Sequence, residues 1–480
     1  MSSTILEDKP RKEEGFEELY RDESFRDALA TVDEEGKRVW LYPKKPKGRF
    51  FNWRVIVSVV LLAFLFFAPI IKVNGQPLLL FDFFNRKFVL FGQIFWPQDF
   101  HLFVLGMIAS VIFIIVFTVA YGRIFCGWIC PQTIFMEVVF RQIEYWIEGD
   151  YRAQKKLNKQ PWNRDKILKR GAKHAIFLAI SFLIMHTFIS YLIGFEEMLQ
   201  LVQTPPTENI GGFMAMLGFT AAFYLVFSQL REQVCTSICP YGRLQGVLLD
   251  RNSIVVAYDH ERGEPRGKIR KNQPQQHNGD CIDCKQCVVV CPTGIDIRNG
   301  TQMECINCTA CIDACDSIMD RISRDRGLIR YASEANIADK VPFRFTGRLK
   351  FYTTVLTLIM GLLVTLLVLR SDIEATVLRT PGMLFQDRED GTVSNLYNYK
   401  VVNKTADEVP FEFRVEGTPA EIQLVGDLLP VPGESIGEGA IFIIMNKNDI
   451  EKMSTKLEIG IYRGDERLQT IKTTFLGPAK

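Results

Sequence analysis

Five long stretches of the chain are apolar and contain no Asp, Glu, Lys or Arg, and polar segments separate them. They are Val55–Ile71, Leu102–Tyr121, Ala175–Phe195, Ile210–Leu230 and Phe351–Leu369. Each has 17–21 residues, and an α-helix of that length crosses about 30 Å of hydrocarbon. A buried core helix is the alternative for any one stretch, but five together predict a membrane protein with five transmembrane helices.

After the fifth stretch the pattern changes to short apolar or alternating segments, which Gly, Pro, Asp and Asn separate. The six candidate strands are Leu396–Val402, Pro410–Val415, Glu421–Val425, Ala440–Met445, Lys456–Tyr462 and Leu468–Phe475. An immunoglobulin-like sandwich has roughly seven such strands. We therefore expect a C-terminal all-β immunoglobulin-like sandwich that rests on its apolar core alone, because this part of the chain contains no cysteine.

Basic residues in the connections predict the orientation of the helices. The connection Gly122–His174 holds eleven Lys or Arg, whereas Glu196–Asn209 holds none. Met1–Phe50 is polar and carries both charges, so we expect a partly disordered cytoplasmic tail and no cleavable signal peptide. The N-terminus and the second and fourth connections are then cytoplasmic, and the part after Leu369 lies on the other side.

The net charge and the positions of the cysteines argue against nucleic-acid binding and against a secreted disulfide framework. The net charge of +2, with 23% charged residues, gives no global attraction to nucleic acid. All 12 cysteines lie between Cys126 and Cys315. A secreted disulfide framework would spread its cysteines through the exported part, so these residues predict a metal or redox role in a reducing compartment.

The fourth connection carries two copies of a four-cysteine motif. The first copy is Cys281, Cys284, Cys287 and Cys291, followed by Pro292; the second is Cys305, Cys308, Cys311 and Cys315, followed by Asp316. In this spacing three thiolates of one motif hold a 4Fe–4S cluster, and the fourth binds the neighbouring cluster.

This rule predicts two ligand sets. Cluster 1 takes Cys281, Cys284, Cys287 and Cys315, and cluster 2 takes Cys305, Cys308, Cys311 and Cys291. A pair of four-cysteine zinc sites is the alternative, but two full tandem copies favour clusters. The aspartate in place of the second proline changes local geometry and should not abolish ligation.

Four further cysteines form a duplicated C-x3-C-P motif at helix ends. Cys126 and Cys130 precede Pro131, and Cys235 and Cys239 precede Pro240 about 109 residues later. If each helix continues through its motif, its two thiols share one face. Four soft thiolates can bind Cu(I) or another thiophilic metal, or cycle between dithiol and disulfide. They can also be small apolar residues, but the duplication favours function.

The resulting fold class is an α-helical membrane protein with five transmembrane helices, a cytoplasmic two-cluster ferredoxin-like domain and a C-terminal sandwich. We expect five segments: a tail at 1–50, a four-helix membrane domain at 51–230, the cluster domain at 231–350, the fifth helix at 351–370 and the sandwich at 371–480.

The chain resembles the CcoG/FixG/RdxA family, the cytochrome c oxidase accessory proteins. The matching segments are "YPKKPKGRF" at 42–50, "FWPQDF" at 95–100, "GRIFCGWICPQT" at 122–133, "CTSICPYGR" at 235–243, "RGEPRG" at 262–267 and the two ferredoxin motifs. The resemblance implies a multi-pass protein of the bacterial inner membrane, with a periplasmic C-terminal domain, that helps to assemble the cbb-type oxidase.

The resemblance also implies oxidoreductase chemistry, the reduction of Cu(II) to Cu(I) for the oxidase copper centre. Its implied partners are oxidase assembly factors and copper chaperones or a copper transporter, with an unknown cytoplasmic electron donor and no nucleic acid. The four helix-end thiols are then the expected catalytic and copper-binding residues.

Two other functions compete with this one. A NapH-like quinol dehydrogenase also combines two C-x3-C-P motifs with two clusters and would pass electrons to a periplasmic partner. A non-catalytic assembly scaffold would use its clusters for structure or redox sensing. Quinol oxidation would favour the first, and failure to reduce Cu(II) with electrons supplied would favour the second.

Overall fold

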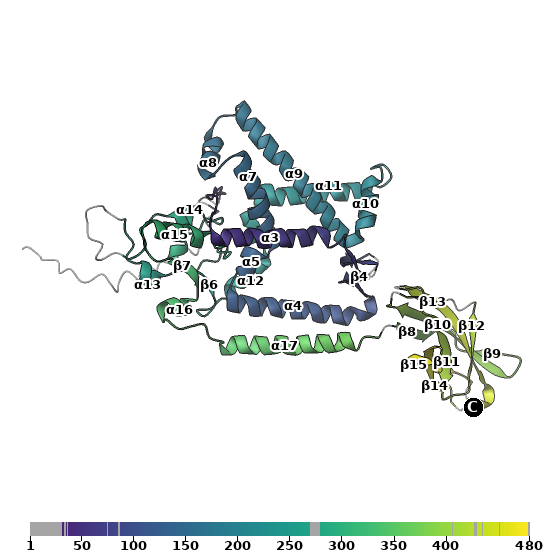
Figure 1. The fold of residues 1–480 in the computed structure, drawn as a ribbon. Helices are drawn as coiled ribbons and strands as arrows, with labels where there is room; N and C mark the ends of the chain where they lie inside the picture. Colours follow the sequence, from purple (N-terminus) through teal and green to yellow (C-terminus); the bar gives the residue numbers. More distant parts are fainter. Residues whose placement is uncertain are drawn as a thin grey trace, which may run out of the picture. The chain divides into compact units, whose positions relative to one another are not determined.

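The computed structural model describes residues 31–478 except 33–34, 36, 74, 85–86, 269–278, 372, 406, 427–429, 434 and 451. Most of the predicted N-terminal tail therefore lies outside the described residues. The chain forms two compact units, which are described separately (Figure 1). The first comprises Met1–Ile71, Pro77–Arg86 and Phe103–Gly361, and the second comprises Lys72–Gln76, Lys87–Leu102 and Leu362–Lys480.

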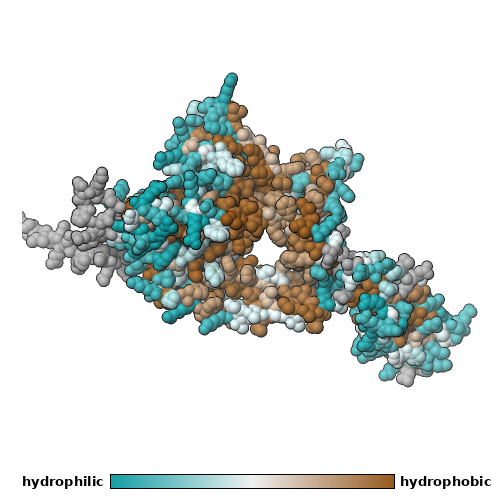
Figure 2. Space-filling view, viewed as in Figure 1, coloured by the Kyte–Doolittle hydropathy of each residue, from teal (hydrophilic) through white to brown (hydrophobic). Residues whose placement is uncertain are grey.

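Five helices of the described chain are long and apolar enough to cross a membrane, which confirms the prediction. They are α3 (Arg49–Phe67), α4 (Phe100–Tyr121), α9 (Arg164–Ile193), α11 (Ile210–Leu225) with its π-helical end η3 (Val226–Leu230), and α17 (Gly347–Val368). Apolar side chains dominate the surface where the long helices of the first unit lie (Figure 2). Such helices suit lipid because their side chains are apolar and each helix satisfies its own backbone hydrogen bonds.

The helix ends differ from the apolar stretches. Helix α9 begins at Arg164, well before the predicted Ala175, because the Asn163 side chain caps it by accepting from the Lys166 N–H at 2.8 Å. Helix α3 ends at Phe67, two residues before Pro69, which cannot continue a helix. Hydropathy measures where apolar side chains lie, whereas caps and prolines set where a helix begins and ends.

Short elements connect the long helices of the first unit. They are β3 (Leu79–Asp82), α5 (Ile124–Trp128), α6 (Pro131–Ile134), the π-helix η2 (Phe135–Phe140), α7 (Arg141–Ile147), α8 (Tyr151–Lys159), α10 (Phe195–Gln203), the π-helix η4 (Val234–Ile238) and α12 (Pro240–Leu248).

The cysteine-rich part folds around a two-stranded antiparallel sheet of β6 (Val255–Tyr258) and β7 (Ile329–Ala332). Its helices are α13 (His260–Gly263), α14 (Gln286–Val289), η5 (Ile297–Asn299), α15 (Ala310–Arg321) and α16 (Glu334–Ala338). Its buried core includes Val256, Ile297, Met319 and Leu328 together with Cys281, Cys287 and Cys315. The cysteines therefore belong to the core of this domain.

The second unit is an all-β sandwich, as predicted. One sheet has the order β12 (Glu421–Val425), β13 (Ile436–Asn446), β10 (Thr392–Asn403) and β8 (Ile373–Arg379), with β9 (Gln386–Asp387) also paired to β10. The other has the order β11 (Glu412–Glu416), β14 (Ser454–Arg463) and β15 (Glu466–Leu476). Tyr397 and Ile441 of the first sheet and Ile459 and Phe475 of the second are fully buried in one core.

All six predicted strands are present, but the prediction missed β8 and β9. Strand β8 buries Ile373, Ala375 and Val377, which alternate along it. Strand β8 follows the fifth apolar helix closely, so its short alternation of apolar and polar residues was not distinguished from the apolar pattern of that helix. The unit also contains the hairpin β4 (Lys87–Leu90) and β5 (Gln93–Phe95), followed by η1 (Pro97–Asp99), and the turn η6 (Lys447–Asp449).

Candidate functional site

The first set of cysteines surrounds a cavity between α14, α15 and the β6–β7 sheet. Cys281, Cys284, Cys287 and Cys315 line it, together with apolar side chains and Arg298. These four residues are the predicted ligand set of cluster 1. Cys284 is exposed, whereas Cys281, Cys287 and Cys315 are buried.

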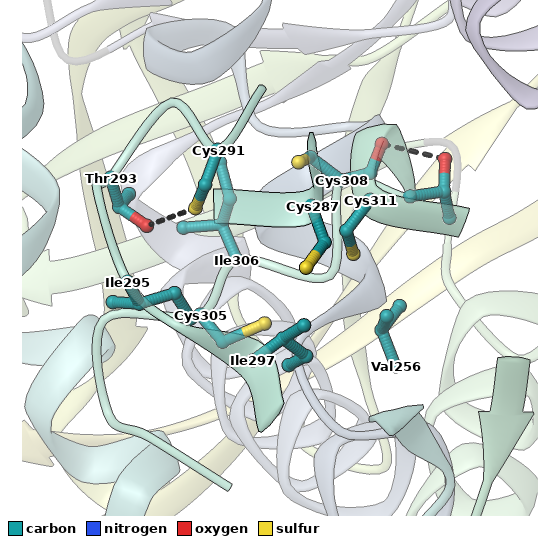
Figure 3. Close-up of a pocket in the computed structure, with 11 residues that line it drawn as sticks. Val256, Cys287, Cys291, Thr293, Ile295, Ile297, Cys305, Ile306, Cys308 and Cys311 are labelled. Carbon is teal, nitrogen blue, oxygen red and sulfur yellow. Dashed lines mark hydrogen bonds between the residues drawn. The ribbon is translucent and has the colours of Figure 1, made fainter. Parts of the chain in front are cut away.

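The second set lines an adjoining cavity (Figure 3). Cys291 comes from the first motif, and Cys305, Cys308 and Cys311 come from the second. Figure 3 shows the sulfur atoms of Cys291, Cys305 and Cys311 pointing toward the space between them. Cys287 lines both cavities, so they share a wall. The fold thus groups the eight cysteines in the two crossed sets that the spacing predicts.

The backbone repeats the same unusual conformation in both motifs. The residues on each side of the second cysteine have positive φ: Asp283 and Lys285 in the first copy, Asn307 and Thr309 in the second, with φ between 50 and 64°. Positive φ is uncommon outside glycine and costs free energy. Its recurrence at equivalent positions shows that both loops wrap a cavity in the same way.

The donor chemistry fits iron–sulfur clusters. Burial raises the pKa of the Cys287, Cys305 and Cys315 thiols to about 12, so each needs a bound cation to persist as a thiolate. In the described part of the chain, no three His, Cys, Asp or Glu side chains are close enough to hold one metal ion. Thiols spread around a cavity suit a cluster of several irons better than a single zinc ion.

Asp316 replaces the second motif proline for a structural reason. Cys315 lies inside α15, which continues to Arg321, whereas Cys291 follows the end of α14. A proline after Cys315 would interrupt α15. Instead, an Asp316 carboxylate oxygen accepts from the Gly327 N–H at 3.0 Å and ties the helix to the following loop.

The helix-end motifs do not continue the helices through their second cysteines. Helix α5 ends at Trp128, and Cys130 leaves the helix with φ −59° and ψ 122°. In the second copy, Cys239 leaves the π-helix η4 with φ −68° and ψ 114°. The condition for two thiols on one helix face is therefore not met, because the proline after each second cysteine begins a new helix as its first residue.

The fold nevertheless brings the four thiols within electrostatic range of one another, although in the described residues no three of them are close enough to hold one metal ion. Cys130 and Cys239 both act electrostatically on Cys126, and Cys126, Cys130 and Cys239 all act on Cys235. Burial, reinforced by the neighbouring thiols, raises the pKa of Cys126 and of Cys235 to about 12. The Cys126 thiol also donates to the Gln245 side-chain oxygen at 3.2 Å.

The first helix-end motif packs directly against the loop of the second cysteine set. A Cβ added to Gly127 would lie 2.4 Å from the carbonyl oxygen of Ile306. Beside it, the Trp128 indole N–H donates to the Tyr331 hydroxyl at 3.1 Å, and that hydroxyl donates to the Asn307 carbonyl at 3.3 Å. The first helix-end motif therefore adjoins the loop that lines the cavity of cluster 2.

Two buried arginines lie between these sites. Arg54 donates to the Gly127 carbonyl at 2.7 Å and favours the charged form of Cys308. Arg123 likewise favours the charged forms of Cys126 and Cys305. The sequence analysis assigned neither arginine to the site, although Arg123 stands three residues before Cys126.

Sequence reasoning also missed a buried network of ion pairs behind the second motif. Arg231 donates to both carboxylate oxygens of Glu144, at 3.0 and 2.8 Å. Arg141 lies between Glu137 at 3.3 Å and Glu232 at 3.6 Å. The helices around these residues are amphipathic or short, and in the sequence their charges look like ordinary charges at the membrane surface.

Comparison with known proteins gives the same domain plan. Residues 230–334 match a family described as a 4Fe-4S dicluster domain, 103–156 match a 4Fe-4S binding domain, and 363–478 match the IG-like fold at the C-terminal of FixG.

Three curated relatives cover most of the chain. The nitrogen fixation protein FixG of Rhizobium meliloti is 35% identical over 84% of this chain and 83% of its own. The proteins RdxB and RdxA of Cereibacter sphaeroides are 34% and 35% identical, over 86% and 79% of this chain and 90% and 83% of their own.

Proposed function

The chain belongs to the family of FixG, RdxA and RdxB, and on that premise we propose that it reduces Cu(II) to Cu(I) for assembly of the cbb-type cytochrome oxidase. Iron–sulfur electron transfer is the shared character of the family and of the two 4Fe-4S domains. One observation carries the copper proposal: four thiols from two distant motifs lie within electrostatic range of one another, and the first of these motifs packs against the loop of the second cysteine set.

Bound 4Fe–4S clusters would supply storage and transfer of single electrons. Cys281, Cys284, Cys287 and Cys315 would hold one cluster, and Cys291, Cys305, Cys308 and Cys311 the other. Buried Arg54 and Arg123 offset the negative charge that the thiolates bring. The protein's own contribution is to hold these groups close together and away from water.

Copper is the substrate in this proposal. One electron added to Cu(II) gives Cu(I), a soft ion that thiolates prefer. The thiols of Cys126 and Cys235 are protonated when free, so they release their protons to water when the ion binds. Cys130 and Cys239, each at the start of a helix, complete the group of four.

The proposed arrangement in the cell follows the distribution of basic residues. The N-terminus, the clusters and the helix-end thiols face the cytoplasm, and the sandwich faces the periplasm of a bacterial inner membrane. Cytoplasmic reductants keep the thiols reduced. The sandwich would contact oxidase assembly factors, and copper chaperones or a copper transporter would exchange copper with the protein.

The test is anaerobic reduction of Cu(II) by the purified full-length protein with both clusters reduced by dithionite and excess dithionite removed. Replacing Cys126, Cys130, Cys235 and Cys239 by Ser is expected to abolish Cu(I) formation and to leave both cluster signals intact. The matched control is Ser237→Ala in the same motif, which removes a hydroxyl instead of a thiol. Reduction that survives the four cysteine changes would remove the thiols from the copper site, and a wild type that forms no Cu(I) would favour a scaffold.

A further inference from the structure

A cavity of about 240 Å³ lies in the first unit, beside helix α9 and the π-helical end η3 of the fourth apolar helix. Neither the cluster cysteines nor the helix-end thiols line it. Its lining carries three cations and two carboxylates, which leaves one excess positive charge: Arg170, Lys173, Arg231, Glu144 and Glu148. All but Arg170 are buried, so the excess charge is costly unless an anion compensates it.

Two of the three cations form close ion pairs. Arg231 donates to both carboxylate oxygens of Glu144, at 3.0 and 2.8 Å. The Lys173 Nζ lies 2.9 Å from a carboxylate oxygen of Glu148. Charge-assisted hydrogen bonds have about these lengths, so the protein itself compensates both of these cations and both carboxylates.

Arg170 is the cation whose donors are not used in a close ion pair. Its Nε lies 3.4 Å from the Glu148 carboxylate, and its Nη2 donates to the Asn158 side-chain oxygen at 3.4 Å. Both contacts are longer than the roughly 2.7–2.9 Å of a close charge-assisted hydrogen bond. A guanidinium carries several N–H donors, so Arg170 can bind an anion without breaking a close ion pair.

A buried hydroxyl in the same cavity also points to a ligand that accepts hydrogen bonds. Ser228 lines the cavity and is only 6% exposed. Within the part of the chain that the structure describes, its Oγ has no hydrogen-bond partner. A buried hydroxyl without a partner costs free energy. A ligand oxygen that accepts from Ser228 would remove this cost.

The cavity lies where two spanning helices leave their apolar stretches. His174 directly precedes the apolar stretch of α9, and Arg231 directly follows the end of the fourth apolar helix. Phe177 adds an apolar lining about one helical turn further along α9. Basic pockets between membrane helices at the cytoplasmic boundary bind anionic lipid head groups, and this boundary faces the cytoplasm in the arrangement proposed for the chain.

We propose that this cavity binds the phosphate group of an anionic phospholipid. A phosphodiester carries a single negative charge, which matches the excess positive charge of the lining. Arg170 and Ser228 donate to the phosphate oxygens, and Phe177 lies on the apolar side toward the lipid chains. A head group with a cation of its own, such as that of phosphatidylcholine, brings the excess charge back and binds more weakly. The inference does not depend on copper reduction.

The experiment uses the purified full-length protein with its clusters, delipidated in dodecyl maltoside. Phosphatidylglycerol and phosphatidylcholine are titrated in; native mass spectrometry counts the retained lipid, and thermal unfolding reports stabilisation by binding. Glycerol 3-phosphate and inorganic phosphate are titrated separately, which distinguishes a soluble source of phosphate from a lipid. The variants are Arg170→Gln and Ser228→Ala. The matched control is Lys169→Gln, which removes the same charge from the neighbouring position of α9, outside the cavity lining.

The wild type and Lys169→Gln should each retain phosphatidylglycerol and be stabilised more by it than by phosphatidylcholine. Arg170→Gln should weaken the binding of phosphatidylglycerol about tenfold through loss of a charged hydrogen-bond donor. Glu148 stays paired in this variant, because Lys173 remains 2.9 Å away. Ser228→Ala should leave the lipid-free protein at least as stable as the wild type, since it removes an unpaired hydroxyl, and should reduce the stabilisation by phosphatidylglycerol.

Either of two results would overturn the lipid site. One is equal binding of the two lipids by the wild type, and the other is binding of phosphatidylglycerol by both cavity variants as tightly as by Lys169→Gln. Stabilisation by glycerol 3-phosphate or inorganic phosphate, without retention of phosphatidylglycerol, would overturn the lipid source and assign the cavity to a soluble phosphate compound. Ser228→Ala keeps every charge and decides the question if Arg170→Gln does not fold.

Discussion

Gly127 lies where the first helix-end motif meets the loop of the second cysteine set, and its replacement by Ala tests whether that contact couples the two sites. The new Cβ would lie 2.4 Å from the Ile306 carbonyl oxygen and 2.9 Å from the carbonyl carbon and oxygen of Asn307. Real Cβ contacts are essentially never shorter than 3.0 Å. All three atoms belong to the backbone, so no side chain can rotate away.

Helix α5 and the loop must therefore separate by at least about 0.6 Å at this point, which is overpacking of a kind that costs about 1–3 kcal/mol. A loss of this size should lower the melting temperature by a few °C. All eight cluster cysteines are kept, but the displaced backbone stands between Cys305 and Cys308, so the rate of Cu(II) reduction should fall and any loss of cluster content should be limited to the second cluster.

The assay combines thermal unfolding in detergent, iron and sulfide content, and the rate at which dithionite-reduced protein forms Cu(I). Gly106→Ala in α4 is the matched control, because its Cβ meets nothing within 4 Å. It should be neutral or slightly stabilising, since Ala is the better helix former. If Gly127→Ala melts and turns over like Gly106→Ala, the close packing of the two sites is refuted.

Three further predictions concern buried charges. Glu144→Gln removes the bidentate carboxylate of Arg231 and should cost up to about 3 kcal/mol in thermal or denaturant unfolding, because it leaves this buried charge with only the longer contact to Glu232 at 3.7 Å. Burial alone would raise the pKa of Glu144, but Arg231 holds it below the usual 4.5, so stability should fall as the pH drops below about 4.5, and Glu144→Gln should flatten this part of the pH profile. In the sandwich unit, Asp99→Asn leaves Arg370 and Lys404, each 2.7 Å from that carboxylate, without their shared anion, and should destabilise the unit by about 3 kcal/mol.

The controls for these changes remove exposed carboxylates of the same kind. Glu197→Gln on α10 and Glu438→Gln on β13 should each stay within about 0.5 kcal/mol of the wild type. A cost for Glu144→Gln or Asp99→Asn no larger than that of its control would show that the buried pair contributes little. A pH profile that is identical with and without Glu144 would show that this carboxylate is not the group that titrates.

The prediction of five helices and of a β-sandwich succeeded because both depend on short-range patterns. A lipid-facing helix needs an unbroken apolar run, and a half-buried strand needs alternation, as in Ile373, Ala375 and Val377 of the strand that was missed. The two crossed cysteine sets were also predictable, since the spacing of Cys281 to Cys291 limits which thiols reach one cavity.

The amino-acid sequence by itself therefore determined the apolar helices, the sandwich and the two sets of cluster cysteines, because each follows from residues close together in the chain. Only the tertiary structure decided that Cys126 lies within electrostatic range of Cys235 and that Gly127 touches the loop at Ile306. These contacts join residues far apart in the sequence. Packing in three dimensions decides these contacts. It also decides buried ion pairs such as that of Arg231 and Glu144, whose members look like ordinary surface charges until the helices come together.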